Sequence, residues 1–152
     1  MPSEDIRWPV GGEIDILENR GRISNISSSA LHFGKQWDNK STLVGEALIP
    51  RQVRFQDKFH SISLVWKENV IAFYLDNSSD PYFTINSNHP EFQKYKYPFN
   101  RDYYMILNVA VGGKYDDYWV DFDAFCNDEE CSNKEDPDSH RFIIDWIEYE
   151  RL

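Results

Sequence analysis

Short extended runs separated by turn residues dominate this sequence and limit the folds open to it. Apolar or alternating runs of strand length cover residues 7–19, 28–34, 59–66, 70–76, 102–111 and 141–152. Turn-forming residues bound them: "GG" follows "DYYMILNVAV", and "KEN" lies between two runs, where it predicts a hairpin with a short turn. No window has the apolar stripe of a helix. The pattern predicts an all-β protein.

Several of these runs are apolar on both faces, most clearly 103–111. Such strands fit the centre of two stacked sheets better than an open, one-sided sheet. The chain has 152 residues, enough for one domain with a buried core. Aromatic residues make up 16% of it, which favours strands and also suits stacking on sugar rings. We therefore expect a β-sandwich that forms one domain over residues 1–152.

Net charge excludes two classes of partner. The chain carries a formal charge of -10 with a pI near 4.7, so it repels both nucleic acid and an anionic membrane surface. No run approaches the roughly 18 apolar residues of a membrane span, and the polar, acidic start predicts no signal peptide in this chain. Glycosylation-type triplets at Asn25, Asn39 and Asn77 only slightly favour secretion.

The two cysteines allow three interpretations. Cys126 and Cys131 stand in "CNDEEC", where a disulfide would close a small surface loop. Two free thiols are the alternative. A metal site is the least favoured, because no further cysteine or close histidine supports it.

The segment "GEIDILE", residues 12–18, poses a geometric problem. In a regular strand Glu13 and Asp15 share one face, whereas Glu18 points to the other. A single β-bulge near residues 16–17 would place two residues opposite one and return Glu18 to the face of the other acids. Bulges often occur beside active sites for this reason. The alternative is an acidic, solvent-facing strand without chemistry.

The spacing of the outer acids predicts a reaction type. A bulged strand separates the backbones of Glu13 and Glu18 by about 13 Å, and side chains leaning together would bring their carboxyl groups to about 5–6 Å. Retaining glycosidases hold two carboxyl groups about 5–5.5 Å apart, whereas inverting ones need roughly 6.5–9.5 Å. Asp15 lies between them, and its charge disfavours ionising all three groups. One proton is then expected to stay near neutral pH, as a general acid requires.

The stretch "WPVGGEIDILENRG" resembles the active-site signature of glycoside hydrolase family 16, in its laminarinase-like branch. That signature is a Trp-Pro pair followed by Glu-x-Asp-x-x-Glu. Two residues before the last Glu mark the bulged form; the lichenase and xyloglucan-transferase branches have one fewer. Other stretches agree in order and extend the resemblance over nearly the whole chain: "ALHFG", "FHSISLVWKENVIAFYLDN", "YYMILNVAVGG" and "IDWIEYERL".

The resemblance implies a jelly-roll, concanavalin A-like sandwich and retaining endo-hydrolysis of β-1,3 bonds in laminarin-type glucan. Glu13 would be the nucleophile, Glu18 the acid and then the base, and Asp15 would tune Glu13. No cofactor is required for this catalysis. The partner would be a β-glucan polysaccharide or oligosaccharide, and the full-length protein would be secreted.

Three further residues match family positions near the catalytic acids or the substrate, and Asn108 is a fourth candidate because of its own pattern. Trp8 would stack on a pyranose, although core packing is the alternative. His32 would lie beside the acids, or else serve as a satisfied structural histidine. Trp37 matches a position often used for substrate contact. Asn108 is a polar residue on an apolar face, either hydrogen-bonded in the core or presented to sugar hydroxyls.

Some family members hold a structural calcium, and Asp145 matches one of its ligands. Its oxygen partners would come largely from residues before the signature, which this chain lacks. Acidic residues after Gly113 are better explained as a solvated loop: Asp116, Asp117, Asp121 and Asp123.

The family's catalytic domain normally begins well upstream of the Trp-Pro pair, so we expect this chain to be the C-terminal portion of such a domain, truncated at its N-terminus. Missing strands would expose sheet edges and core surface, which homodimerisation could cover; the sequence leaves the oligomeric state open. The competing functions are a non-catalytic β-glucan-binding protein and an inactive glucanase fragment. Intact Glu13, Asp15 and Glu18 argue against the first.

Overall fold

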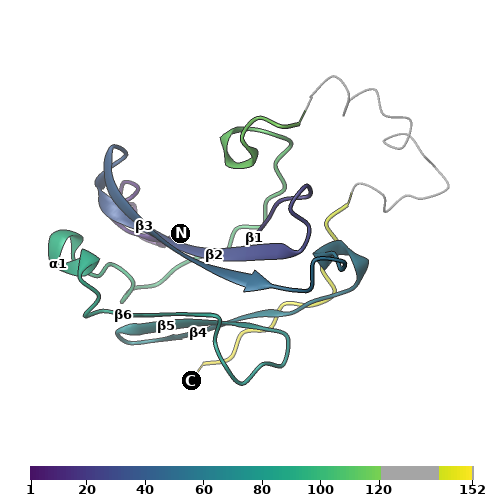
Figure 1. Ribbon diagram of the computed structural model, residues 1–152. Coiled ribbons are helices and arrows are strands. Elements are labelled where there is room, and N and C mark those ends of the chain that lie inside the picture. Colours follow the sequence, from purple (N-terminus) through teal and green to yellow (C-terminus); the bar gives the residue numbers. More distant parts are fainter. Residues whose placement is uncertain (121–140, 152) are drawn as a thin grey trace. The chain divides into compact units, whose positions relative to one another are not determined.

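The computed structural model describes residues 1–120 and 141–151 (Figure 1). The chain forms two compact units, Met1–Ile106 and Leu107–Leu152. The elements of the first unit are β1 (Glu13–Asn19), β2 (Ile26–Gln36), β3 (Asn39–Leu48), the 3-10 turn η1 (Phe55–Asp57), β4 (Ile62–Lys67), β5 (Val70–Leu75), β6 (Phe83–Asn86) and α1 (Glu91–Tyr95). The second unit contains the 3-10 turn η2 (Lys114–Asp116). No helix in the described part of the chain is long and apolar enough to cross a membrane.

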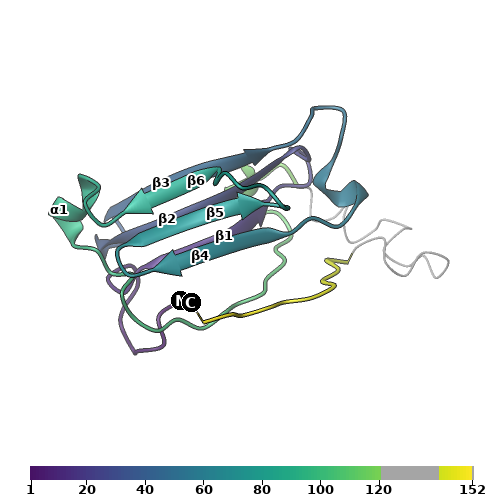
Figure 2. The same ribbon diagram turned by 90° about the horizontal axis from the view of Figure 1, so that it is seen from below.

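Two antiparallel sheets form the first unit, one in the order β1-β2-β3 and the other β4-β5-β6. They lie face to face as two layers, as both views show (Figures 1 and 2). The prediction of an all-β sandwich is confirmed.

The core lies between the layers and is built from alternate residues of facing strands. Leu31 and Phe33 of β2 and Ile71 and Phe73 of β5 are 0% exposed. Phe99 is buried with them, its ring edge-on to that of Phe33 at 6.0 Å between centroids. Because side chains alternate along a strand, burying these residues of β2 turns the residues between them to the outer face of the sheet. The candidate site lies on that outer face.

The predicted hairpin is present. Lys67 of β4 pairs with Val70 of β5 across a two-residue turn, and Asn69 there has a φ of 64°, a conformation that asparagine tolerates better than most residues. The sequence did not predict β3 or β6. β3 is an edge strand with mostly exposed or half-buried side chains, and β6 has only four residues, so neither carries a strong apolar signal.

The sequence also predicts strands over 102–111 and 141–152, and here the structure differs. Residues 104–111 and 141–151 contain no strand, and Tyr103 makes a single isolated bridge. Apolar alternation favours an extended backbone, but a strand forms only where a neighbouring backbone supplies hydrogen-bond partners. In the part of the chain that the structure describes, residues 1–3 supply such partners only to the start of the first segment, where the Ser3 N–H donates to the Asp102 carbonyl and the Tyr104 N–H donates to the Met1 carbonyl.

Gly12, at the entrance to β1, fixes where Glu13 begins the strand. Its φ is +82°, and a Cβ there would lie 2.6 Å from the Tyr103 hydroxyl and 2.8 Å from the Phe99 ring. The same Tyr103 hydroxyl donates a hydrogen bond to the carbonyl of Gly11 at 2.7 Å. The backbone before the acidic strand is therefore held against two aromatic side chains, at a distance that only glycine permits.

We expect Gly12→Ala to lower the free energy of unfolding by about 2 kcal/mol or more, because it adds both left-handed strain and a clash. Urea denaturation measures the change. Gly21→Ala is the matched control, since a Cβ at Gly21 meets nothing within 4 Å. Equal stability of the two variants would contradict the packing described for Gly12.

Candidate active site

The pairing of β1 with β2 contains the predicted bulge. Asp15 pairs with Ala30, and the next paired residue of β1, Glu18, pairs with Ser28. Three steps along β1 thus match two steps along β2, so two residues of β1 stand opposite one residue of β2. The register shift near residues 16–17 is confirmed.

The shift decides which way the three acids face. Residues directly opposite in an antiparallel pair project to the same face, and Glu13 pairs with His32. The partners of Glu13, Asp15 and Glu18 are every second residue of β2, which share one face. All three acids therefore lie on the outer face of the sheet with His32. Plain alternation would have turned Glu18 toward the core.

His32 connects the acids to β3. Its Nε2 lies 3.2 Å from Oδ2 of Asp15, within ion-pair distance although without the alignment of a hydrogen bond. Its Nδ1 is 2.8 Å from the Thr42 hydroxyl, which also accepts from Lys40 Nζ at 3.3 Å. The imidazole is thus held at both nitrogens, with one edge toward Asp15. Thr42 and Lys40 were not predicted from the sequence, because their place depends on the register of β3, which was not predicted either.

Of the two predicted tryptophans, Trp8 contacts an acid and Trp37 packs against Trp8. The indole Nε1 of Trp8 donates a 2.6 Å hydrogen bond to Oε2 of Glu13. The rings of Trp8 and Trp37 are 5.1 Å apart between centroids, and Lys40 Nζ lies 5.5 Å and 5.9 Å from them. Trp8 is half-buried and Trp37 is 70% exposed. Such faces can stack on the apolar side of a pyranose.

The environment of Glu18 favours its protonated form. Burial raises the pKa of Glu18 above its ordinary value, and the charges of Asp15 and Glu13 raise it further. His32 and Arg20 act in the opposite direction but do not cancel the shift. Burial first, and charge repulsion on the shared face second, thus favour a retained proton. The charge repulsion is the part that the acid spacing predicts. That proton is the one a general acid would donate.

The site also offers donor atoms to a cation. Glu13, Asp15 and His32 each contribute one ligand atom, all within 4.8 Å of one another. These are the same groups that the acid chemistry uses. In the described part of the chain this is the one group of three His, Cys, Asp or Glu side chains close enough to hold a metal, and Asp145 does not belong to it. A calcium site at Asp145 stays a prediction, without support from such a group.

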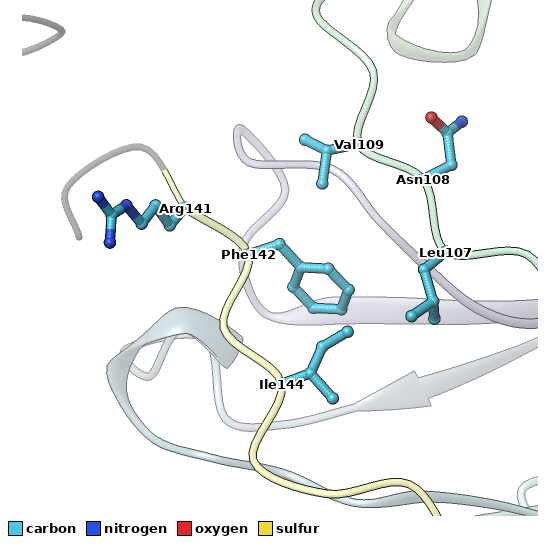
Figure 3. A pocket seen from close by; sticks show the side chains of 6 residues that line it. All are labelled: Leu107, Asn108, Val109, Arg141, Phe142 and Ile144. Atoms are coloured by element: carbon cyan, nitrogen blue, oxygen red, sulfur yellow. The ribbon is translucent and has the colours of Figure 1, made fainter. Parts of the chain in front are cut away.

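Asn108 and Asp145 belong to the second unit. Asn108 lines an open cavity of about 330 Å³, together with Leu107, Val109, Arg141, Phe142 and Ile144. Figure 3 shows that the lining is mainly apolar and that the Asn108 amide points away from the Phe142 ring. A role in substrate binding for Asn108 stays a prediction. Cys126 and Cys131 lie outside the described residues, as do Asp121 and Asp123.

Comparisons with known proteins identify the family of this chain. The sequence model for glycosyl hydrolases family 16 matches residues 1–148. Glucan endo-1,3-beta-glucosidase A1 of Niallia circulans is 34% identical, over 76% of this chain and 18% of that protein. Beta-1,3-glucan-binding protein of Penaeus monodon is 32% identical, over 70% of this chain and 34% of that protein. The chain therefore spans well under half the length of either relative.

A solved structure shares the fold. The family 16 endo-glucanase from Bacteroides ovatus, in complex with G4G3G-2F-DNP, superposes with a TM-score of 0.53 at 24% identity. The match covers 66% of this chain and 42% of that protein. At this identity the likeness supports the jelly-roll fold.

We expect Glu18 to titrate above the ordinary glutamate pKa of 4.5 in a ¹³C NMR titration of its carboxyl carbon. Asp15→Asn should lower the pKa of Glu18, because it removes a nearby negative charge. Asp80→Asn, in an exposed turn, is the control and should leave that titration unchanged. A Glu18 pKa at or below the ordinary value would contradict the shared face.

Proposed function

The chain belongs to glycosyl hydrolase family 16, and from this premise we propose that it cleaves internal β-1,3 bonds of glucan with retention of anomeric configuration. The observation that carries the proposal is the register shift between Asp15 and Glu18. It supports a pair of carboxyl groups that act together on one bound sugar.

In the first step the carboxylate of Glu13 attacks the anomeric carbon. As the glycosidic C–O bond breaks, the carboxylic acid of Glu18 donates its proton to the departing oxygen. The products are a free sugar hydroxyl and a glycosyl ester on Glu13. The raised pKa of Glu18, which burial and the neighbouring acids cause, supports its protonated state at this step.

In the second step Glu18, now a carboxylate, takes a proton from water. The resulting hydroxide oxygen attacks the anomeric carbon and displaces Glu13. Two inversions return the original configuration. Glu18 regains its proton and Glu13 its charge, so the site is ready for another cycle without a cofactor.

The residues around the pair suit these roles. The Trp8 indole N–H binds one oxygen of Glu13, which fixes the carboxylate and leaves its other oxygen for attack. Asp15 adds negative charge that favours the proton on Glu18, and His32 holds the Asp15 carboxylate from the side. We assign sugar stacking to Trp8 and Trp37, whose ring centroids lie 5.1 Å apart.

The substrate class follows from the relatives together with the site. The bacterial relative is named for endo-1,3-glucan cleavage, and the branch with two residues before the last Glu is the laminarinase-like one. We propose laminarin-type β-glucan as the substrate of the full-length protein. Its secretion and a calcium at Asp145 belong to the same proposal.

A second candidate function is binding of β-glucan without cleavage. The Penaeus relative is named for β-1,3-glucan binding, and the half-buried Trp8 beside the exposed Trp37 could hold a glucan without any chemistry. A binding protein has no use for a proton held on Glu18 or for an indole hydrogen bond to Glu13. These features favour the enzyme.

With laminarin as substrate, we expect new reducing ends from the intact chain and a loss of about 10³-fold or more in kcat for Glu13→Gln, because the amide is a far weaker nucleophile. Glu68→Gln, in the exposed β4–β5 turn, is the control and should retain full activity. Glucan binding without new reducing ends from the intact chain would exclude the enzyme and leave the binding function. Equal activity of Glu13→Gln and the intact chain would remove Glu13 as nucleophile.

The acid role of Glu18 predicts a dependence on the leaving group. On laminarin, Glu18→Gln should lower kcat/KM by about 10²–10⁴-fold. On a dinitrophenyl laminarioligoside the leaving phenolate needs no proton. The first equivalent of phenolate should therefore appear with Glu18→Gln at nearly the rate seen with the unsubstituted protein. Turnover should then slow, because no base activates water. Stopped-flow absorbance separates the two phases, and an equal loss on both substrates would contradict this assignment.

A further inference from the structure

The bulge that orients Glu18 leaves a gap in the backbone hydrogen bonds between β1 and β2. A bulged residue has no ladder partner, so its carbonyl must find another donor when it is buried. Ser29 stands on β2 between Ser28 and Ala30, the residues that pair with Glu18 and Asp15. It is therefore the residue of β2 opposite the bulge.

The side chain of Ser29 supplies the missing donor. Ser29 is 0% exposed and belongs to the core-facing row of β2 that includes Leu31 and Phe33. Its hydroxyl donates to the carbonyl oxygen of Ile16 at 2.7 Å. Ile16 is one of the two bulge residues, so a buried side chain completes the hydrogen bonding there.

Tyr82, just before β6 in the opposite sheet, completes the chain of hydroxyls. Its Oη lies 2.6 Å from Oγ of Ser29. The single proton of Ser29 is committed to the Ile16 carbonyl, which can only accept. Tyr82 must therefore donate to Ser29, which gives a continuous path from Tyr82 through Ser29 to Ile16 across the sandwich.

The neighbouring serines act on the other end of the bulge, more weakly. The hydroxyls of Ser27 and Ser28 lie 3.4 Å and 3.5 Å from the carbonyl oxygen of Glu18. The run "SSS" on β2 thus places hydroxyls near the carbonyls of Ile16 and Glu18. The bond from Ser29 to Ile16 is shorter than the contacts of Ser27 and Ser28, and the Ser29 hydroxyl also contacts Tyr82 of the opposite sheet.

We propose that Ser29 and Tyr82 are positioning residues for the acid/base Glu18. They hold the bulge in β1 and so keep the Glu18 carboxyl on the face of Glu13, although neither side chain touches that face. The inference rests on the proposed function, because positioning matters for catalysis only if Glu18 is the acid. Its structural part, control of where Glu18 lies, does not depend on activity.

The test compares two deletions of a buried tyrosine hydroxyl. Tyr82→Phe breaks the path to Ile16 and keeps the ring. Tyr97→Phe removes another buried hydroxyl, one without a hydrogen-bond partner, and is the matched control. Ser29→Ala breaks the path at its centre, and the double variant of Ser29 and Tyr82 tests whether the two act as one unit. Thermal unfolding of each protein identifies any variant that does not fold.

In laminarin hydrolysis we expect Tyr82→Phe and Ser29→Ala to lower kcat by about 10–100-fold with KM within about twofold of the unsubstituted value, because a misplaced acid affects the transition state more than binding. Tyr97→Phe should match the unsubstituted chain. The double variant should lose no more than the worse single variant, since both deletions break the same path.

A second readout needs no activity. The ¹³C titration of the Glu18 carboxyl should move toward the ordinary glutamate value in Tyr82→Phe and Ser29→Ala but not in Tyr97→Phe. If both variants titrate and turn over as Tyr97→Phe does, the proposal is overturned. If the unsubstituted chain does not hydrolyse laminarin, the proposed function fails, and the titration still decides the positioning role. If Ser29→Ala does not fold, the comparison of Tyr82→Phe with Tyr97→Phe decides it.

Discussion

The side of the sheet on which Glu18 lies depends on one extra residue in β1. Between Asp15 and Glu18 that strand advances three positions while β2 advances two. Glu13, Asp15 and His32 share a face by plain alternation, and the shift brings Glu18 to that face as well. There, burial and the charges of Asp15 and Glu13 favour a proton on Glu18. Without the shift the chain would keep the same acids, but Glu18 would point into the apolar core, where an ionised carboxylate is strongly disfavoured.

The core and the site lie on opposite faces of β2, because the side chains of that strand alternate between the two faces. Leu31 and Phe33 anchor the inner face of that strand against β5, which fixes His32 on the outer face. Gly12 and the Tyr103 hydroxyl fix the start of β1. Because β1 is held at its start and paired with β2 on both sides of the bulge, the extra residue lies between Asp15 and Glu18. There the buried hydroxyl of Ser29 donates to the carbonyl of Ile16.

Sequence reasoning found the bulge because two observations agreed: acids out of phase by one residue, and the spacing of a known signature. It also found the hairpin at "KEN", since two apolar runs flank a polar turn. It did not find β3, whose exposed edge-strand residues lack a pattern, and therefore could not place Thr42 and Lys40 beside His32. The runs at 102–111 and 141–152 show the opposite error, because apolar alternation describes a residue's preference and not the presence of a neighbouring strand. Ser29 was also out of reach, because a serine in a strand gives no sign of the carbonyl it bonds.

Trapping the glycosyl-enzyme tests the roles of the two glutamates most directly. A 2-deoxy-2-fluoro laminarioligoside with a dinitrophenyl leaving group should react once with the chain. The fluorine slows both steps, but dinitrophenolate leaves so readily that the glycosyl ester still forms, whereas its hydrolysis becomes very slow. Peptide mass spectrometry should then find one glycosyl ester, on Glu13. An ester on Glu18, or release of dinitrophenolate with no ester on any residue, would contradict the central claim that the bulge sets Glu13 and Glu18 to act as nucleophile and acid on one sugar.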